Sequence, residues 1–182
     1  KITAAKERGI DVTTPARMLV GAKKAFEDNR FDDAEKLIKS SMKELENILS
    51  REEVKRIGRE ITELSKVIEE IGIGLVSAEI RENIKNFKSL LSQKKYADAN
   101  KLGKEILDIL KKSLEEYLSG LVAKLEKTIY DLKQEGIVIP VRDEELSALK
   151  DSIIKGEYKK CYHMYQNLRK KISEIAEAYY LY

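Results

Sequence analysis

Apolar residues recur at alternating steps of three and four along most of this chain, which is the spacing of one face of an α-helix. The clearest stripe consists of Tyr158, Cys161, Tyr165, Leu168, Ile172, Ile175, Tyr179 and Tyr182. Earlier stripes consist of Val54, Ile57, Ile61, Leu64, Ile68 and Ile71, and of Leu107, Leu110, Leu114, Leu118, Leu121, Leu125 and Leu132. The pattern predicts long helices that begin at Phe31, Tyr96 and Tyr158.

A shorter amphipathic helix is predicted before each long one, over residues 15–28, 76–92 and 143–155. Thr14 precedes Pro15, and a hydroxyl followed by proline favours a helix start. Asn29 and Gly156 tolerate the left-handed conformation that ends many helices. Lys94 takes the equivalent place in the middle copy, where we expect a weaker stop.

The same order of elements occurs three times. A glycine followed by isoleucine opens each copy at Gly9, Gly72 and Gly136, and the period of about 64 residues is typical of a repeat architecture. A short helix must bury its apolar stripe against its neighbours in the sequence. The sequence therefore predicts an all-α fold: elongated tandem antiparallel three-helix bundles that share long continuous helices.

This repeat divides the chain into three predicted segments. Residues 1–51 form a truncated first repeat, 52–117 a second three-helix bundle and 118–182 a third. Because the chain starts in the middle of a repeat, we interpret it as a segment of a longer protein. Ser50 with Glu53 forms a capping-box pattern, so the first long helix is a candidate for a break at Ser50. Gly58 and Gly103, inside predicted helices, indicate close packing or a bend.

Two resemblances follow from these patterns. Proline-free stretches over residues 31–72 and 96–136, each passing from one antiparallel unit into the next, resemble spectrin-type repeats, although spectrin units are longer and usually carry a tryptophan. The phrase from Ala22 to Ala34 resembles the corner of tetratricopeptide repeats, although the period here is nearly double theirs. Both resemblances imply a protein that holds partners or spans distance without catalysis.

The amino-acid composition argues against some classes of protein but does not identify a function. Thirty-five basic and 32 acidic side chains leave a net charge of +3, so the chain lacks the strong positive field of many nucleic-acid-binding proteins. One cysteine excludes an internal disulfide, and no apolar run reaches the length of about 20 residues that spans a bilayer. The cytoplasm is slightly favoured as the compartment. Few glutamines among many lysines and glutamates are weakly indicative of a thermophilic source.

Candidate chemistry is sparse. Cys161 and His163 are the only cysteine and histidine. A zinc site needs about four ligands. The side chains of two residues that lie two apart on a helix also point in very different directions, so these two do not bind one zinc ion. Cys161 falls on the apolar stripe, so we expect a buried structural cysteine. Acidic pairs such as Glu52 and Glu53 diverge by about 100° on a helix and are best explained as solvated surface. We therefore predict no catalytic residues, no metal site and no cofactor.

One cluster of charges offers an alternative. Basic residues gather near the end of the chain at Lys159, Lys160, Arg169, Lys170 and Lys171. The best hypothesis remains a non-enzymatic structural or interaction module, a rigid helical-repeat spacer or scaffold within a larger protein, whose partners are other proteins or flanking domains. The alternative is a module that binds an anionic partner, a nucleic acid or an acidic protein or lipid surface, through this basic face. Among these anionic partners, we consider a nucleic acid unlikely.

Overall fold

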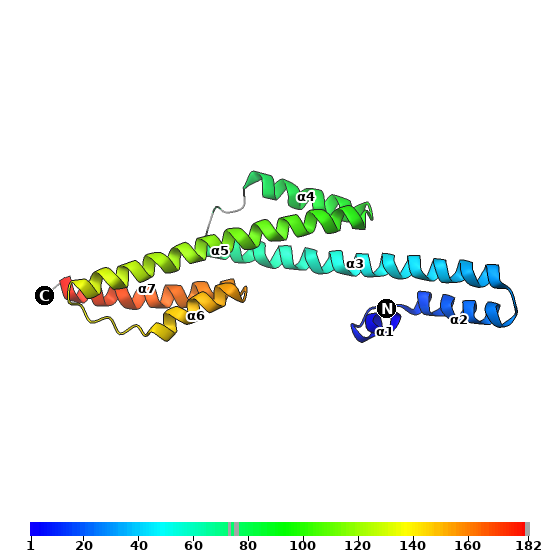
Figure 1. Ribbon diagram of the computed structural model, residues 1–182. Helices are drawn as coiled ribbons and strands as arrows, with labels where there is room; N and C mark the ends of the chain where they lie inside the picture. Colours follow the sequence, from blue (N-terminus) through cyan, green and yellow to red (C-terminus); the bar gives the residue numbers. More distant parts are fainter. Residues whose placement is uncertain (73, 75–76, 181–182) are drawn as a thin grey trace. The chain divides into compact units, whose positions relative to one another are not determined.

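The computed structural model describes residues 1–72, 74 and 77–180, and within them it contains seven α-helices and no strand (Figure 1). The predicted all-α class is confirmed. The helices are α1 (Ile2–Glu7), α2 (Thr13–Glu27), α3 (Phe31–Ile71), α4 (Ala78–Ser92), α5 (Tyr96–Gln134), α6 (Asp143–Ile154) and α7 (Tyr158–Tyr180). None of the helices in the described part has the length and apolar character of a membrane span.

The long helices begin where the apolar pattern predicts, at Phe31, Tyr96 and Tyr158. The sequence left open whether the first long helix breaks at Ser50, and the structure shows that α3 continues for 41 residues through that position. Buried Leu45, Ile48 and Val54 on either side of Ser50 keep the apolar stripe against the core, so packing holds the helix together across the local capping signal.

The start of α2 corrects one expectation. Thr14 is the second residue of this helix and not its cap. The Asp11 carboxylate instead accepts hydrogen bonds from the Thr13 backbone N–H at 3.0 Å and from the Thr13 hydroxyl at 2.7 Å. A carboxylate two residues upstream thereby satisfies a free N–H of the first turn. Val76, the predicted start of the second short helix, lies outside the described residues, and α4 begins at Ala78.

The short helices α2, α4 and α6 end in the same way. Asn29, Lys94 and Gly156 adopt positive φ angles of 60°, 59° and 71°. The next backbone N–H in each case returns to a carbonyl five residues earlier, as Arg30 does to Ala25 at 2.8 Å. This is the Schellman arrangement. Lys94 therefore ends α4 with the same geometry as its equivalents, although its side chain disfavours that conformation.

The described helices divide into two compact units. The first consists of Lys1–Ile61 and Ile80–Ile106, and the second of Thr62–Glu79 and Leu107–Tyr182. Helices α3 and α5 each contribute residues to both units. The sequence predicts three segments, with boundaries after residues 51 and 117. This division remains a prediction.

Close helix contacts form the core of the first unit. The buried Ser41 hydroxyl of α3 donates a hydrogen bond to the Pro15 carbonyl of α2 at 2.9 Å. A Cβ atom added to Gly103 of α5 would lie 2.5 Å from Ile57 Cγ2 of α3 and 2.7 Å from Phe87 Cε2 of α4. The absence of a side chain at Gly103 thus lets three helices meet, which confirms the close packing predicted there.

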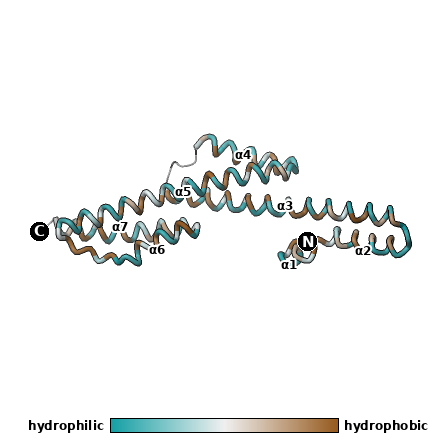
Figure 2. The backbone as a smooth tube through the Cα atoms, viewed as in Figure 1, coloured by the Kyte–Doolittle hydropathy of each residue, from teal (hydrophilic) through white to brown (hydrophobic). Residues whose placement is uncertain are grey.

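The second unit has a leucine-rich core. Leu110, Leu114 and Leu118 of α5 are fully buried, and the predicted stripe of α7 is buried from Tyr158 to Ile172. Beyond Ile172 the prediction is less accurate, since Ile175 is half-buried and Tyr179 is exposed. Tyr182 lies outside the described residues. Apolar residues return at regular intervals along each long helix (Figure 2).

Candidate interaction surfaces

Cys161 is buried in the contact between α7 and α6, as predicted. Its Sγ atom donates a hydrogen bond to the Leu149 carbonyl at 3.6 Å, and burial raises the pKa of the thiol to about 11. A thiol with such a pKa is protonated at neutral pH and is a poor nucleophile or metal ligand. His163 is exposed. Among the described residues no group of three or more His, Cys, Asp or Glu side chains is placed to hold a metal ion.

The five predicted basic residues lie on α7, and their side chains are exposed. At about 100° per residue, Lys159 and Lys170 fall on one line of the helix and Lys160 and Lys171 on a second. Arg169 falls on neither line. The helix therefore spreads these cations over more than half of its circumference and does not bring them together.

Four of these cations have a carboxylate partner. Lys160 contacts Glu157 at 2.7 Å and Lys170 contacts Glu174 at 3.8 Å, both within α7. The other two pairs join helices of the second unit: Lys159 contacts Glu70 of α3 at 2.8 Å, and Lys171 contacts Glu145 of α6 at 3.6 Å. Because each pair is locally neutral, the positive potential that would attract an anion is weakened.

The pairs between helices also shift the pKa of their carboxylates. The hydrogen bond from Lys159 lowers the pKa of Glu70. The pKa of Glu145 is lowered chiefly by the backbone N–H of Arg142, which donates to this carboxylate at 3.0 Å, and further by Lys171. Glu145 therefore caps the start of α6 while it also contacts α7. In the described part of the chain, the contact of Glu145 with Lys171 links α6 to α7.

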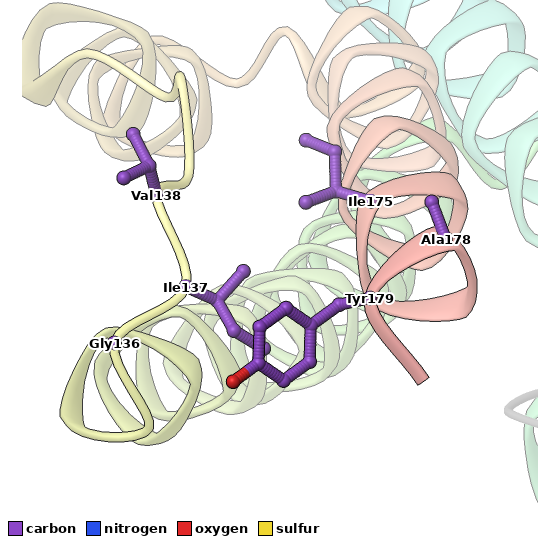
Figure 3. Close-up of a pocket in the computed structure, with 6 residues that line it drawn as sticks. All are labelled: Gly136, Ile137, Val138, Ile175, Ala178 and Tyr179. Carbon is purple, nitrogen blue, oxygen red and sulfur yellow. The ribbon is translucent and has the colours of Figure 1, made fainter. Parts of the chain in front are cut away.

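The second unit contains an open hollow of about 760 Å³ at the end of α7 (Figure 3). It is lined by Gly136, Ile137, Val138, Ile175, Ala178 and Tyr179. The Tyr179 ring lies beside Ile137, and the lining side chains are apolar apart from the Tyr179 hydroxyl. A catalytic or cofactor pocket needs several converging polar groups, and this lining does not supply them.

A smaller hollow of about 340 Å³ lies between α5 and α6 in the same unit. It has two charged groups in its lining, Glu126 and Lys150, and these bind each other at 2.7 Å. An opposite-charge pair of this kind links α6 to α5. Neither of these two hollows brings an acid, a base and a nucleophile together in its lining.

An apolar surface was missed by the sequence reasoning. It lies on the hairpin of α2 and α3 and consists of Leu19, Phe26, Phe31, Ile38 and Met42, which are between 40% and 62% exposed. We call it the α2–α3 apolar surface. Phe26 and Phe31 meet edge to face with ring centroids 5.3 Å apart. Ile38 and Met42 directly follow Leu37 and Ser41, which belong to the apolar stripe in the first half of α3. A second stripe beside the first was therefore the available signal.

In the described residues, lysines of α7 are paired with carboxylates, and α2 and α3 carry exposed apolar side chains. Scattered apolar side chains are normal on protein surfaces, but a contiguous group marks a candidate contact site. Comparison of the chain with protein-family models, with curated proteins and with solved structures finds no match.

Proposed function

We propose that this chain is a non-enzymatic structural and interaction module, a helical-repeat spacer or scaffold that works within a larger protein. The finer architecture that we propose is a series of three-helix bundles which share their long helices. The observation that carries this proposal is the threefold repetition of one unit: a short helix, a left-handed residue and a long helix. The linking helices α3 and α5 are unbroken over 41 and 39 residues.

Continuous helices suit a spacer. An α-helix rises by 1.5 Å per residue, so a rod of 41 residues spans roughly 60 Å. A helix that packs along its whole length is stiffer than a loop, because each of its turns is held by backbone hydrogen bonds and by side chains of its neighbours. In α3 this packing includes Leu45 and Ile48 near its middle and Ile68 near its end, all of them buried.

Contacts between side chains support the bundle arrangement. Ile57, Phe87 and Gly103 bring α3, α4 and α5 together in the first unit. In the second unit, Tyr158 of α7 donates a hydrogen bond to Glu115 of α5 at 2.8 Å, and Cys161 of α7 bonds to α6. Each of these two sets joins the short helix and the long helix of one copy to the long helix that precedes them.

Spin-label distances test the spacer role. Labels placed on the exposed side chains at positions 36 and 66 of α3 are separated by thirty residues, which is about 45 Å in one helix. A matched pair at positions 101 and 127 of α5 is separated by about 39 Å. We expect a narrow distance distribution for each pair. Shorter or broad distributions in α3 would show a hinge and contradict a stiff spacer.

Small-angle scattering of the whole chain tests the elongated architecture that we propose. A compact domain of this length has a radius of gyration of about 16 Å. Tandem bundles joined by shared helices require a clearly larger value. A radius near 16 Å would exclude the tandem arrangement, whatever the spin labels report for a single helix.

A further inference from the structure

The Phe87 ring of α4 lies between two glycines on two other helices. A Cβ atom added to Gly58 of α3 would lie 3.4 Å from Phe87 Cε1, and one added to Gly103 of α5 would lie 2.7 Å from Phe87 Cε2. These two atoms are on opposite edges of the ring, so each edge faces a position without a side chain. Phe87 is only 2% exposed. We call the space between Gly58 and Gly103 the glycine socket.

The two long helices also contact each other without Phe87. A Cβ atom at Gly103 of α5 would lie 2.5 Å from Ile57 Cγ2 of α3. Ile57 is fully buried, as is Val54 about one turn before it. This contact between α3 and α5 is direct and does not pass through α4.

By contrast, α4 is attached through few side chains. Of its 15 residues, Ile80 and Phe87 are the buried ones, and they lie about two turns apart. Three further apolar side chains are half-buried: Ile84, Leu90 and Leu91. The ion pair of Lys85 with Glu82 is exposed and lies within the helix, so it does not join α4 to a neighbour. Phe87 is thus the largest buried side chain that attaches α4.

The equivalent short helix α6 has more attachments. It buries three of its 12 residues. Lys150 binds Glu126 of α5 at 2.7 Å, and Glu145 contacts Lys171 of α7 at 3.6 Å. Helix α6 is therefore attached to both of its neighbouring long helices by ion pairs as well as by buried side chains.

We infer that α4 is a latch: it separates from α3 and α5 as one helix while the long helices stay folded, and Phe87 in the glycine socket holds it closed. Elements with few buried apolar contacts open at a lower free energy than the core of the same domain. Opening uncovers Ile57 and the two glycines, a part of α3 and α5 that Phe87 covers in the closed state. The inference goes beyond the spacer role, which depends on the long helices.

Amide hydrogen exchange of the full chain, followed by mass spectrometry, tests the latch. After correction for the intrinsic rate of each sequence, we expect the amides of α4 to exchange at least about tenfold faster than those of α6, since exchange follows the free energy of local opening. The amides of residues 54–61 in α3 should exchange no faster than those of α6.

A substitution at Phe87 identifies the contact that holds the latch closed. Phe87→Leu should speed exchange in α4 by about tenfold or more, because the smaller side chain leaves part of the socket empty. Exchange in α6 should not change. Phe26→Leu is the matched control, because Phe26 also belongs to a short helix but is 62% exposed, and it should leave exchange in α4 unchanged. Circular dichroism checks that both variants remain helical.

Gly103→Ala tests the socket itself. In the natural chain the added methyl group meets the Phe87 ring and should speed exchange in α4. In the Phe87→Leu chain the same change should have a smaller effect on α4, because substitutions of two residues in contact are not additive. Equal effects in both chains would mean that the methyl group acts through Ile57 alone, and would overturn the role of the socket.

Three further results would overturn the inference: exchange in α4 no faster than in α6, equal acceleration of residues 54–61 and of α4 in Phe87→Leu, or an equal effect of Phe26→Leu on α4. The second result would show that α4 opens only together with the whole unit. The spin-label distances within α3 test the spacer separately, so failure of the latch is distinguishable from failure of the spacer proposal.

Discussion

Gly103 is the residue at which helix packing depends most directly on a missing side chain. We expect Gly103→Ala to lower the free energy of unfolding by up to about 2 kcal/mol. The added methyl group meets Ile57 Cγ2 at 2.5 Å and the Phe87 ring at 2.7 Å, and overpacking of this kind costs roughly 1–3 kcal/mol. This cost exceeds the gain of about 1 kcal/mol in helix propensity. Thermal unfolding followed by circular dichroism measures the change.

Gly120→Ala is the matched control in the same helix. A Cβ atom at Gly120 meets no other atom within 4 Å, so only the helix propensity changes, and we expect stabilisation of up to about 1 kcal/mol. If both variants were stabilised, the three-helix contact at Gly103 would be looser than the structure indicates.

Cys161 leads to a pH prediction. Its pKa is raised from 9.0 to about 11 by burial. Between these values the unfolded chain loses the thiol proton while the folded chain keeps it, so the free energy of unfolding falls as the pH rises. The contribution is complete below pH 9. We expect the melting temperature of the natural chain to fall more steeply from pH 9 to 11 than that of Cys161→Ala. Parallel curves would mean that the thiol ionises in the folded state.

At the scale of the helix, a proline substitution tests whether α3 is continuous through Ser50. We expect Arg51→Pro to destabilise the chain by about 3 kcal/mol, because proline in a helix interior removes a backbone hydrogen bond and clashes with the preceding turn. If a helix began at Ser50, proline would occupy its first position and cost little. Chemical denaturation measures the difference.

Asp143→Pro provides the comparison. Asp143 is the first residue of α6, and the preceding Arg142 is extended, with φ −84° and ψ 148°, which is the conformation that a following proline favours. Its cost should be much smaller than that of Arg51→Pro. An equally small cost at both positions would show that α3 starts again near Ser50.

The end of α4 carries a strained residue. Lys94 has a φ angle of 59°, and a residue with a Cβ atom loses roughly 1–2 kcal/mol in the left-handed conformation. Lys94→Gly removes that cost but adds flexibility to the unfolded chain, so we expect a net stabilisation of about 0.5–1 kcal/mol. The reverse change, Gly156→Lys, should destabilise by a similar amount, as measured by thermal unfolding. A loss of stability in Lys94→Gly would show that the lysine side chain makes a compensating contact.

Most helix boundaries could be predicted from the sequence, because the apolar spacing and the left-handed residues act within a few turns of the chain. The starts at Phe31, Tyr96 and Tyr158 are of this kind. The missed cap at Asp11 and the absent break at Ser50 are different cases. At Asp11 two local start signals competed, and the one used is the contact with Thr13 two residues on. At Ser50 the burial of Leu45, Ile48 and Val54 outweighed the local capping signal.

At the scale of the whole molecule, the paired charges of α7 predict weak binding of polyanions. Four of the five predicted cations already contact carboxylates, so few counterions would be released when a nucleic acid binds. We expect no measurable binding of a labelled DNA oligonucleotide at about 0.15 M salt. The double variant Lys170→Glu with Lys171→Glu should give the same result. Binding that weakens steeply with salt and is lost in this double variant would favour the anionic-partner alternative.

The candidate contact surface could be predicted only in part. The second stripe at Ile38 and Met42 is visible in the sequence. The sequence does not reveal that this stripe is exposed to solvent, because an apolar stripe has the same sequence pattern whether or not another helix covers it.

By itself the sequence determined the all-α class, the period of about 64 residues, the starts of the three long helices and the left-handed ends of α2, α4 and α6, because these depend on side-chain spacing and on local backbone preferences. Only the tertiary structure decided which helices meet at Gly103, which carboxylates pair with the lysines of α7 and which apolar face of α2 and α3 remains exposed. Those outcomes depend on contacts between residues far apart in the chain, and no local pattern encodes which partner will be there.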